Sequence, residues 1–74
     1  MIRSKIVAKL SKGRKLKIKR VTAGKTLAQV AASSGVSIGM LSMLERDLRF
    51  CSKQHASKIA KAYGARIADL PMKT

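Results

Sequence analysis

The amino-acid sequence predicts an all-α fold, a compact bundle of about five short helices. Apolar residues recur at intervals of about three and four, which is the spacing of one face of a helix. Serine, threonine and glycine stand where helices would start and stop. Alternation typical of a strand occurs only at residues 16–19, which is too short to outweigh the helical context. A chain of 74 residues forms one domain at most. The helices indicated by caps and spacing lie near residues 27–34, 38–46, 53–63 and 66–70.

The clearest helix start is at Thr26. Its hydroxyl can accept hydrogen bonds from the first amides of a helix over 27–34, and Gln29, which follows at capping-box spacing, completes the motif. Gly35 ends this helix, because glycine readily takes the left-handed conformation of a C-terminal cap. The apolar stripe of the helix consists of Leu27, Val30 and Ala31.

A second helix start follows almost at once. Only Val36 separates Gly35 from Ser37, which is the expected N-cap of a helix over 38–46. Two short helices joined by a glycine-containing turn of about three or four residues must cross at a steep angle. The sequence therefore predicts a helix-turn-helix. Its second helix carries an apolar stripe at Ile38, Leu41 and Leu44, with Glu45 beside it.

Two further segments complete the bundle. Ser52 can cap a helix over 53–63, and a last short turn over 66–70 is expected to bury Ile67 and Leu70. The apolar stripe of the longer helix consists of Ala56, Ile59, Ala60 and Tyr63.

Charge is the strongest compositional signal. There are 17 lysine and arginine residues and three acidic ones, so the net charge is +14 and the isoelectric point is near 11.2. Ordinary solubility needs a net charge of only about 2–8. Residues 1–25 carry ten of the cations and no acid, whereas residues 26–45 carry no cation and one acid, Glu45. Such an excess repels itself unless a polyanion neutralises it, so nucleic acid is the expected partner.

Other classes of function lack the residues they need. Cys51 is the only cysteine and His55 the only histidine, so neither an intramolecular disulfide nor a zinc site is expected. The sequence offers no nucleophile with a paired base and no pair of carboxylates, so we do not expect an enzyme. It has no apolar run of about 18 residues and no signal-peptide pattern, so we expect no membrane association. No cofactor, metal or small-molecule substrate is expected.

The middle of the chain resembles a known family. The run Thr26-Leu-Ala-Gln-Val-Ala-Ala-Ser-Ser-Gly-Val-Ser-Ile-Gly-Met-Leu-Ser-Met-Leu-Glu-Arg46 is similar to the helix-turn-helix core of the Cro/CI/Xre family, which includes the DNA-binding domains of lambdoid phage repressors. The stretch 57–70 resembles that family's fourth and fifth helices, and the resemblance covers about residues 14–70. It implies a five-helix bundle whose first helix lies near residues 14–22, and a DNA-binding transcriptional regulator from a phage or a bacterium.

The resemblance also implies an internal ion pair. Arg20 and Glu45 stand where phage repressors of this type pair an arginine of the first helix with a glutamate ending the third. Glu45 is the sole acid between residues 1 and 46, so it is the only local partner for a buried cation. The chain departs from the family pattern at Lys25 (for an apolar residue), Leu27 (for glutamine), Asp47 (for glycine), Cys51 (for proline), and Lys53 and Ser57 (for leucines).

In this motif the second helix enters the major groove and its first residues reach base edges. Its leading positions lack arginine, asparagine and glutamine, which read bases most often, so serine hydroxyls and apolar contacts to thymine methyl groups are left for this role. The residues expected to face the bases are Ser37, Ile38, Gly39, Ser42 and Met43. Those expected to contact phosphates are Lys25, Gln29, Arg46, Arg49 and Lys53.

Three functions are open at this point. The first is a Cro-like, sequence-specific regulator, expected to act as a repressor and as a homodimer in the bacterial cytoplasm, with the nucleoid. The second is a DNA accessory protein of low specificity. The third is an antitoxin or modulator that binds a protein partner through Ile38, Met40 and Met43, since methionine adapts to varied surfaces. The first is the leading hypothesis, and DNA is favoured over a protein partner because the excess of positive charge needs an anion.

The chain is expected to consist of a basic arm (1–13), the helix-turn-helix domain (14–70) and a short tail (71–74). Two forms of the arm are open. It could be an amphipathic helix that packs on the body or on a dimer mate, or a flexible basic segment that tracks DNA. The apolar residues that would line the helix are Ile2, Ile6 and Leu10.

Overall fold

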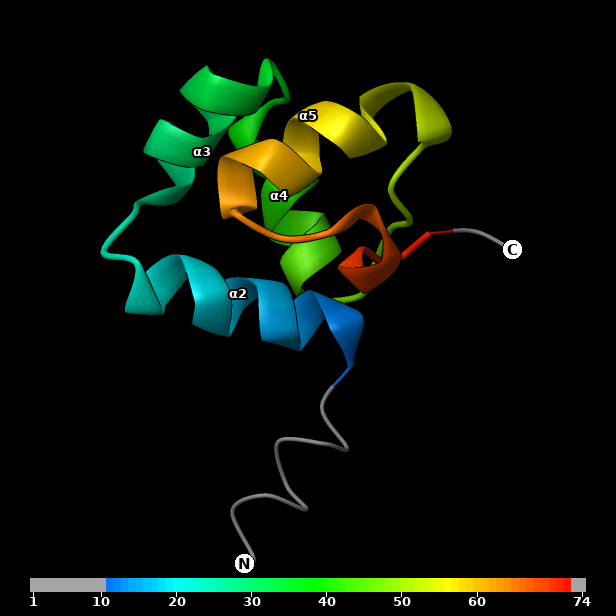
Figure 1. Cartoon of the computed structure of the whole chain (residues 1–74), viewed down its shortest axis with the longest axis horizontal. Coiled ribbons are helices and arrows are strands. Elements are labelled where there is room, and N and C mark those ends of the chain that lie inside the picture. The colour runs from blue at the N-terminus through cyan, green and yellow to red at the C-terminus, as the bar shows by residue number, and fades with distance from the viewer. Residues whose placement is uncertain (1–10, 73–74) are drawn as a thin grey trace, which may run out of the picture.

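The computed structural model of the chain describes residues 11–72. This part consists of four α-helices and one 3-10 helix, which confirms the all-helical fold (Figure 1). The expectation of about five helices was slightly wrong, because the last turn is too short and too tight to be an α-helix. What was expected of residues 1–10 and 73–74 lies outside the described part. The elements are α2 (Lys12–Thr22), α3 (Leu27–Ser34), α4 (Ile38–Glu45), α5 (Lys53–Tyr63) and η1 (Ile67–Asp69).

Helix α2 begins at Lys12, two residues before the predicted start. The hydroxyl of Ser11, its N-cap, accepts a hydrogen bond from the amide of Arg14 at 3.2 Å. The carboxylate of Asp47, which follows α4, accepts another from the amide of Gly13 at 3.1 Å. These partners satisfy two amides of the first turn, so the helix starts in spite of its glycine. Lys12 and Gly13, which the sequence placed in the arm, are therefore helical.

Helices α3 and α4 form the predicted helix-turn-helix, with a bend of 114° between them. The capping box is present, because Thr26 accepts from the amide of Gln29 at 3.1 Å and its own amide donates to the Gln29 side chain at 2.8 Å. Gly35 has a φ of 74°, a conformation that costs glycine nothing. The hydroxyl of Ser37 then accepts a hydrogen bond from the amide of Met40 and starts α4.

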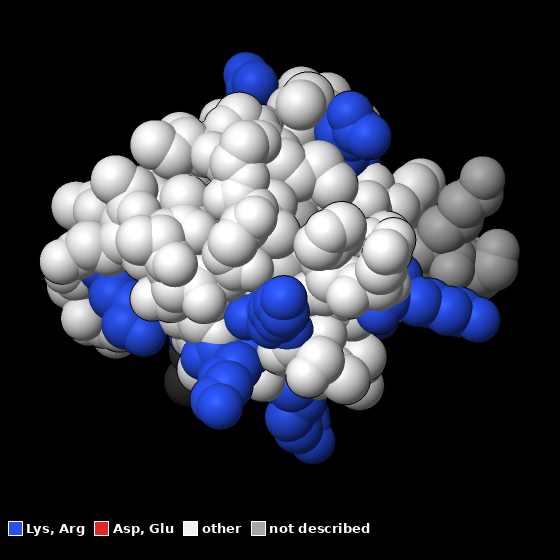
Figure 2. Space-filling model, turned by 90° about the horizontal axis from the view of Figure 1, so that it is seen from above, with Lys and Arg blue, Asp and Glu red and all other residues white. Residues whose placement is uncertain are grey.

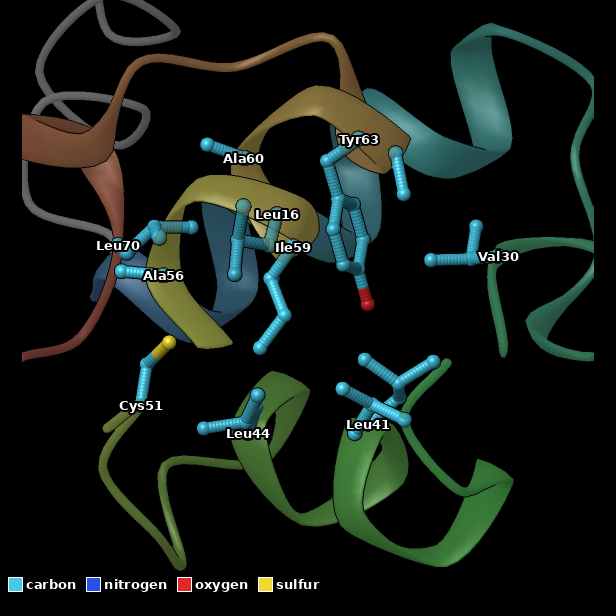
Figure 3. Packing of buried hydrophobic residues seen from close by; sticks show 12 residues of the cluster. Leu16, Val30, Leu41, Leu44, Cys51, Ala56, Ile59, Ala60, Tyr63 and Leu70 are labelled. Atoms are coloured by element: carbon cyan, nitrogen blue, oxygen red, sulfur yellow. The ribbon is translucent and has the colours of Figure 1, made fainter. Parts of the chain in front are cut away.

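Side chains from the four α-helices and from Leu70 meet in one hydrophobic core (Figure 3). Leu41 and Leu44 of α4 face Ile59 of α5 there, and all three are fully buried. Burying a side chain of this kind stabilises the fold by about 1.5–3 kcal/mol. The predicted stripe of α5 is buried as expected. The core consists of Leu16, Val30, Val36, Leu41, Leu44, Cys51, Ala56, Ile59, Ala60, Ala62, Tyr63 and Leu70.

Two details of the C-terminal part differ from expectation. Ile67 is 50% exposed, so it was wrong to place it in the core with Leu70. The 3-10 turn ends at Asp69 and Leu70 is extended, so Ile67 and Leu70 do not share one helical face. Ser52 is the N-cap of α5, but its hydroxyl pairs with the ring nitrogen Nδ1 of His55 at 2.8 Å instead of capping an amide. The carbonyl of Pro71 accepts a hydrogen bond from the amide of Cys51 at 2.8 Å, which ties the start of the tail to the body.

Within residues 11–72, no single helix has the length and the apolar composition to cross a membrane. Helices α3 and α4 meet these criteria only when they are taken together as a bent pair.

Candidate nucleic-acid interface

The first turn of α4 presents the leading base-facing candidates at the surface. Ser37, Ile38 and Gly39 are all exposed, and the Ile38 side chain keeps 48% of its accessible surface. A Cβ atom added at Gly39 would have no neighbour within 4 Å. Ser42 and Met43, one turn further on, are partly buried. The first turn therefore offers a free edge with two small residues beside one large apolar side chain.

Met40 lies on a different side of α4. It is partly buried and packs against the core. The apolar surface suggested for a protein partner therefore consists mainly of Ile38, with Met43 partly covered.

The cations that follow α4 are exposed. Arg46 is the C-cap of α4, Arg49 lies in the loop, and Lys53 begins α5. In the space-filling view, lysine and arginine side chains project at separate places around a largely uncharged centre, with no acidic side chain visible on this face (Figure 2). Leu48 and Phe50 on either side of Arg49 are exposed as well, although the sequence did not single them out.

The two remaining phosphate candidates have other partners. The side-chain oxygen of Gln29 accepts from the amide of Thr26, which leaves its NH2 group to donate outward at the start of α3. The ammonium of Lys25 donates to the carbonyl of Ala62 at 3.1 Å, near the C-terminal end of α5. A cation there compensates the partial negative charge of a helix end. This contact gives Lys25 a structural role.

Asp47 is a residue whose role the sequence did not reveal. It lies between Arg46 and Arg49, yet its carboxylate turns back to the start of α2, where it accepts from Gly13 and from the hydroxyl of Ser11. Its φ is 60°, in the left-handed region that suits glycine and, less well, aspartate. The sequence did offer one signal of this role, because Asp47 stands where the family pattern has glycine. The loop that carries the cations is thereby fixed to α2.

Arg20, Glu45 and Tyr63 join three helices at the end of α4. Arg20 donates to both carboxylate oxygens of Glu45, from Nε at 2.8 Å and from a terminal nitrogen at 3.0 Å. The Tyr63 hydroxyl donates to the same carboxylate at 2.6 Å. Arg20 and Glu45 are the two residues for which the resemblance implied a pair. Tyr63 was expected only as a core residue, because nothing in the spacing shows where its hydroxyl points.

The electrostatics of this cluster follow from its burial. The hydrogen bond to Glu45 raises the pKa of Arg20, so the guanidinium stays charged. Burial, and then the hydrogen bond to Glu45, raises the pKa of the Tyr63 hydroxyl far above its usual value, so this group stays protonated. Glu45 is only 3% exposed, and three charge-assisted hydrogen bonds offset its desolvation. The cluster thus fixes the position of α4 relative to α2 and α5.

Two helices cross at a steep angle, the first turn of the second helix is exposed, and Arg20 and Tyr63 fix its other end. This arrangement defines the class of small helix-turn-helix proteins. The family model for helix-turn-helix domains of the Cro/C1 type matches residues 16–70, and the chain belongs to this family. It is thus a DNA-binding protein of the transcription-regulating class, and the assignment points to a non-enzymatic role. Among solved structures, the chain is similar to the clp gene regulator ClgR from C. glutamicum, with 38% sequence identity and a TM-score of 0.67. That similarity covers 78% of this chain and 75% of the other. The search of curated proteins gave no match.

Proposed function

We propose that the chain is a sequence-specific transcriptional repressor that inserts α4 into the major groove of its operator. The observation that carries this proposal is the exposed first turn of α4, where Ile38 keeps 48% of its surface and the space beside Gly39 is open. A helix that reads DNA needs such an edge and a rigid support behind it. The bonds of Glu45 to Arg20 and Tyr63 provide that support.

Contacts with bases and contacts with phosphates have different roles in this proposal. Ser37 and Ser42 can exchange hydrogen bonds with base edges, and Ile38 and Met43 can contact thymine methyl groups, while Gly39 permits a close approach. The cations Arg46, Arg49 and Lys53 neutralise phosphates and supply most of the affinity. The amides at the start of α3, together with the free NH2 of Gln29, add a further phosphate contact. Because Lys25 already binds the end of α5, we leave it out of the interface.

The chain acts as a homodimer in this proposal. A helix-turn-helix pair reads two half-sites about one helical turn apart, so a partly palindromic operator is expected. Repression follows from occupancy, because a bound dimer excludes other proteins from the same stretch of DNA. Since the target is DNA, the protein works in the cytoplasm of the host bacterium, with the nucleoid.

Selection of bound sites from random DNA duplexes, repeated at two salt concentrations, tests the proposal. We expect one partly palindromic motif to be enriched and to remain enriched at the higher salt, where phosphate contacts are weaker. Lys17→Ala is the control variant: it removes an exposed cation of α2 outside the proposed interface and should enrich the same motif as the wild type. Enrichment of no motif would overturn sequence-specific reading.

A DNA accessory protein of low specificity is the second candidate. The observation in its favour is that the exposed turn of α4 carries none of the arginine, asparagine and glutamine side chains that form bidentate contacts with bases. In that case the salt dependence stays steep while all duplexes bind alike, and DNA shape decides the small preferences that remain.

A further inference from the structure

A groove with a volume of about 710 Å³ lies between α2 and the segment that joins α5 to η1. None of the residues that we propose to contact DNA lines it. The groove extends along the whole of α2, from Lys12 to Ala23. Since a helix rises about 1.5 Å per residue, this length is roughly 16 Å, or about three helical turns. We call it the α2 groove.

The floor of the α2 groove is apolar. Ile18, which keeps 49% of its surface exposed, lies there with buried residues of the core. Covering this side chain would remove apolar area from contact with water, which is favourable. The other apolar residues of the floor are Leu16, Ala23, Tyr63 and Ala65.

Lysines form the rim of the groove. Two of them are engaged, because Lys12 donates to the carbonyl of Ala68 at 3.1 Å and Lys25 to that of Ala62. Lys15 and Lys19, one turn apart on α2, make no side-chain hydrogen bond with any other residue between 11 and 72.

One acid lines the groove, and its charge is offset by Arg66 and by the nearby Lys19. The carboxylate of Asp69 accepts hydrogen bonds from the backbone amide and the guanidinium of Arg66 at 3.2–3.4 Å. The free charge of the rim is therefore positive.

We infer that the α2 groove binds an acidic amphipathic helix of a protein partner. The apolar face of such a helix covers Ile18, and carboxylates along its edge pair with Lys15 and Lys19. Docking of an amphipathic helix into a groove lined by apolar residues is a general mode of peptide recognition, and charge complementarity selects the partner.

Other occupants fit the charges less well. A second copy of the chain carries a net charge of +14, and residues 1–10 contain three cations and no acid, so the lysines of the rim repel both. The phosphates of DNA would satisfy the lysines but leave the apolar floor uncovered. Only an acidic segment with an apolar face satisfies both features.

The probe for this inference is a synthetic helix of about 15 residues, with leucines on one face and glutamates elsewhere. Its binding to the isotope-labelled full chain is followed by the amide signals of Gly64 and Ala65 in the groove and of Gly39 outside it. We expect the first two to shift and Gly39 to stay unchanged. A peptide with lysines in place of the glutamates should not bind.

Two pairs of variants separate groove binding from general attraction. Ile18→Ser and Lys19→Glu should each weaken binding about tenfold or more, since one removes apolar contact and the other reverses a rim charge. Val21→Ser and Lys17→Glu are matched controls on the same helix, exposed but outside the groove, and should have little effect. All four side chains are exposed, so the fold should tolerate these changes.

The inference is overturned if Lys17→Glu weakens binding as much as Lys19→Glu, because the attraction is then only that of net charge. It is also overturned if the peptide shifts Gly39 instead of Ala65. Concentration-dependent dimerisation that Ile18→Ser abolishes would assign the groove to a second copy. Competition by random-sequence DNA that the two groove variants relieve, and the control variants do not, would assign it to nucleic acid.

Discussion

The carboxylate of Glu45 connects α4 to two other helices. It is 3% exposed and accepts hydrogen bonds from Arg20 of α2 and Tyr63 of α5. Burying a charge is costly, so the net contribution of the cluster to stability is smaller than its short distances suggest. Removing one partner costs more, because the charges that remain are left incompletely compensated.

We expect Tyr63→Phe to lower the free energy of unfolding at neutral pH by about 1.5–3 kcal/mol, the range for a hydrogen bond to a charged group. The ring stays in the core, so the change isolates the hydroxyl. Urea unfolding of both proteins measures the difference. A loss below about 0.5 kcal/mol would mean that the two bonds from Arg20 already satisfy Glu45.

The same hydroxyl predicts a pH dependence. Its pKa in the folded chain is raised above the ordinary value of 10.0, mainly by burial. The proton is therefore held more tightly in the folded state, and the associated stability is complete below pH 10.0 and is lost as the pH rises above that value. We expect the wild type to lose more stability than Tyr63→Phe above this pH.

Because Tyr63 is the only tyrosine, phenolate absorption reports it alone. The phenolate should form only when the chain unfolds. Its appearance near pH 10.0 in a folded chain would contradict the raised pKa.

Two glycines make a matched test of local packing. A Cβ at Gly13 would overlap the carbonyl oxygen of Leu44 and approach Asp47 Oδ1 to 2.6 Å, whereas a Cβ at Gly39 meets open space. Gly13→Ala should therefore destabilise the fold by about 1–3 kcal/mol, although helix propensity alone favours alanine. Gly39→Ala should stabilise the free protein by about 0.5–1 kcal/mol. Thermal unfolding compares them, and equal effects would contradict the close contact at Gly13.

At the scale of the element, α4 combines a buried face with an exposed edge. Leu41 and Leu44 anchor it in the core, while Ser37, Ile38 and Gly39 remain free. The buried face and the exposed edge lie on different sides of this eight-residue helix, so each can be changed separately.

Leu44→Ala removes the anchor. Leu44 is fully buried, and the cavity left behind should lower the free energy of unfolding by about 2–5 kcal/mol. In a domain this small, that is a large part of the total stability. Calorimetry should show a strongly lowered melting temperature, and a shift of only a few degrees would remove Leu44 from the centre of the core.

Gly39→Glu changes the edge. The space around Gly39 accepts a side chain in the free protein, so the variant should fold. On DNA, the added bulk and negative charge face phosphates, and binding to the selected operator should weaken by about a hundredfold or more. A folded variant with wild-type affinity would show that α4 is not in the groove. Gly39→Ala, which adds bulk without charge, separates the two causes.

Local chemistry made most of the elements predictable. Thr26, Gly35 and Ser37 act on neighbouring amides, so their spacing alone located the ends of α3 and α4. The start of α2 was missed although its N-cap, Ser11, is local, because the partner that satisfies Gly13, Asp47, is distant in the sequence. Ile67 was misplaced because the helical turn ends at Asp69, and the extended Leu70 does not continue its face.

The candidate site was predictable in part. The caps located the first turn of α4, the helix-turn-helix motif suggested that this turn faces outward, and a family pattern suggested Arg20 with Glu45. The direction of long side chains could not be predicted. Lys25 was expected to contact phosphate, and the spacing could not show that its ammonium donates to the carbonyl of Ala62 at the end of α5. The lysines of the α2 groove line one surface because α2 packs beside η1, which the sequence does not show.

At the scale of the molecule, the helix-turn-helix is poor in charge and the loop after it is rich in cations. Residues 26–45 contain no cation, while Arg46, Arg49 and Lys53 follow directly. In the proposed interface, general attraction and sequence reading therefore come from separate residues.

Arg49→Ala and Lys53→Ala test this separation. Each should weaken binding about equally on all duplexes and reduce the slope of log affinity against log salt by about one, because one phosphate contact is lost. Filter binding at several salt concentrations gives the slope, and Lys17→Ala serves as the control with an unchanged slope. If either variant keeps the wild-type slope while specificity relaxes, that residue reads bases instead.

The uncharged centre of the helix-turn-helix has a consequence for how such a protein can diverge. In the proposed interface, substitutions at Ile38, Ser42 or Met43 would alter which bases are preferred without disturbing the cations that contact phosphates. A gene duplicate could therefore pass through intermediates that still bind DNA and still fold, and acquire a new operator by single steps. The first regulator would retain its own targets, and cross-talk between the two would decline with each substitution.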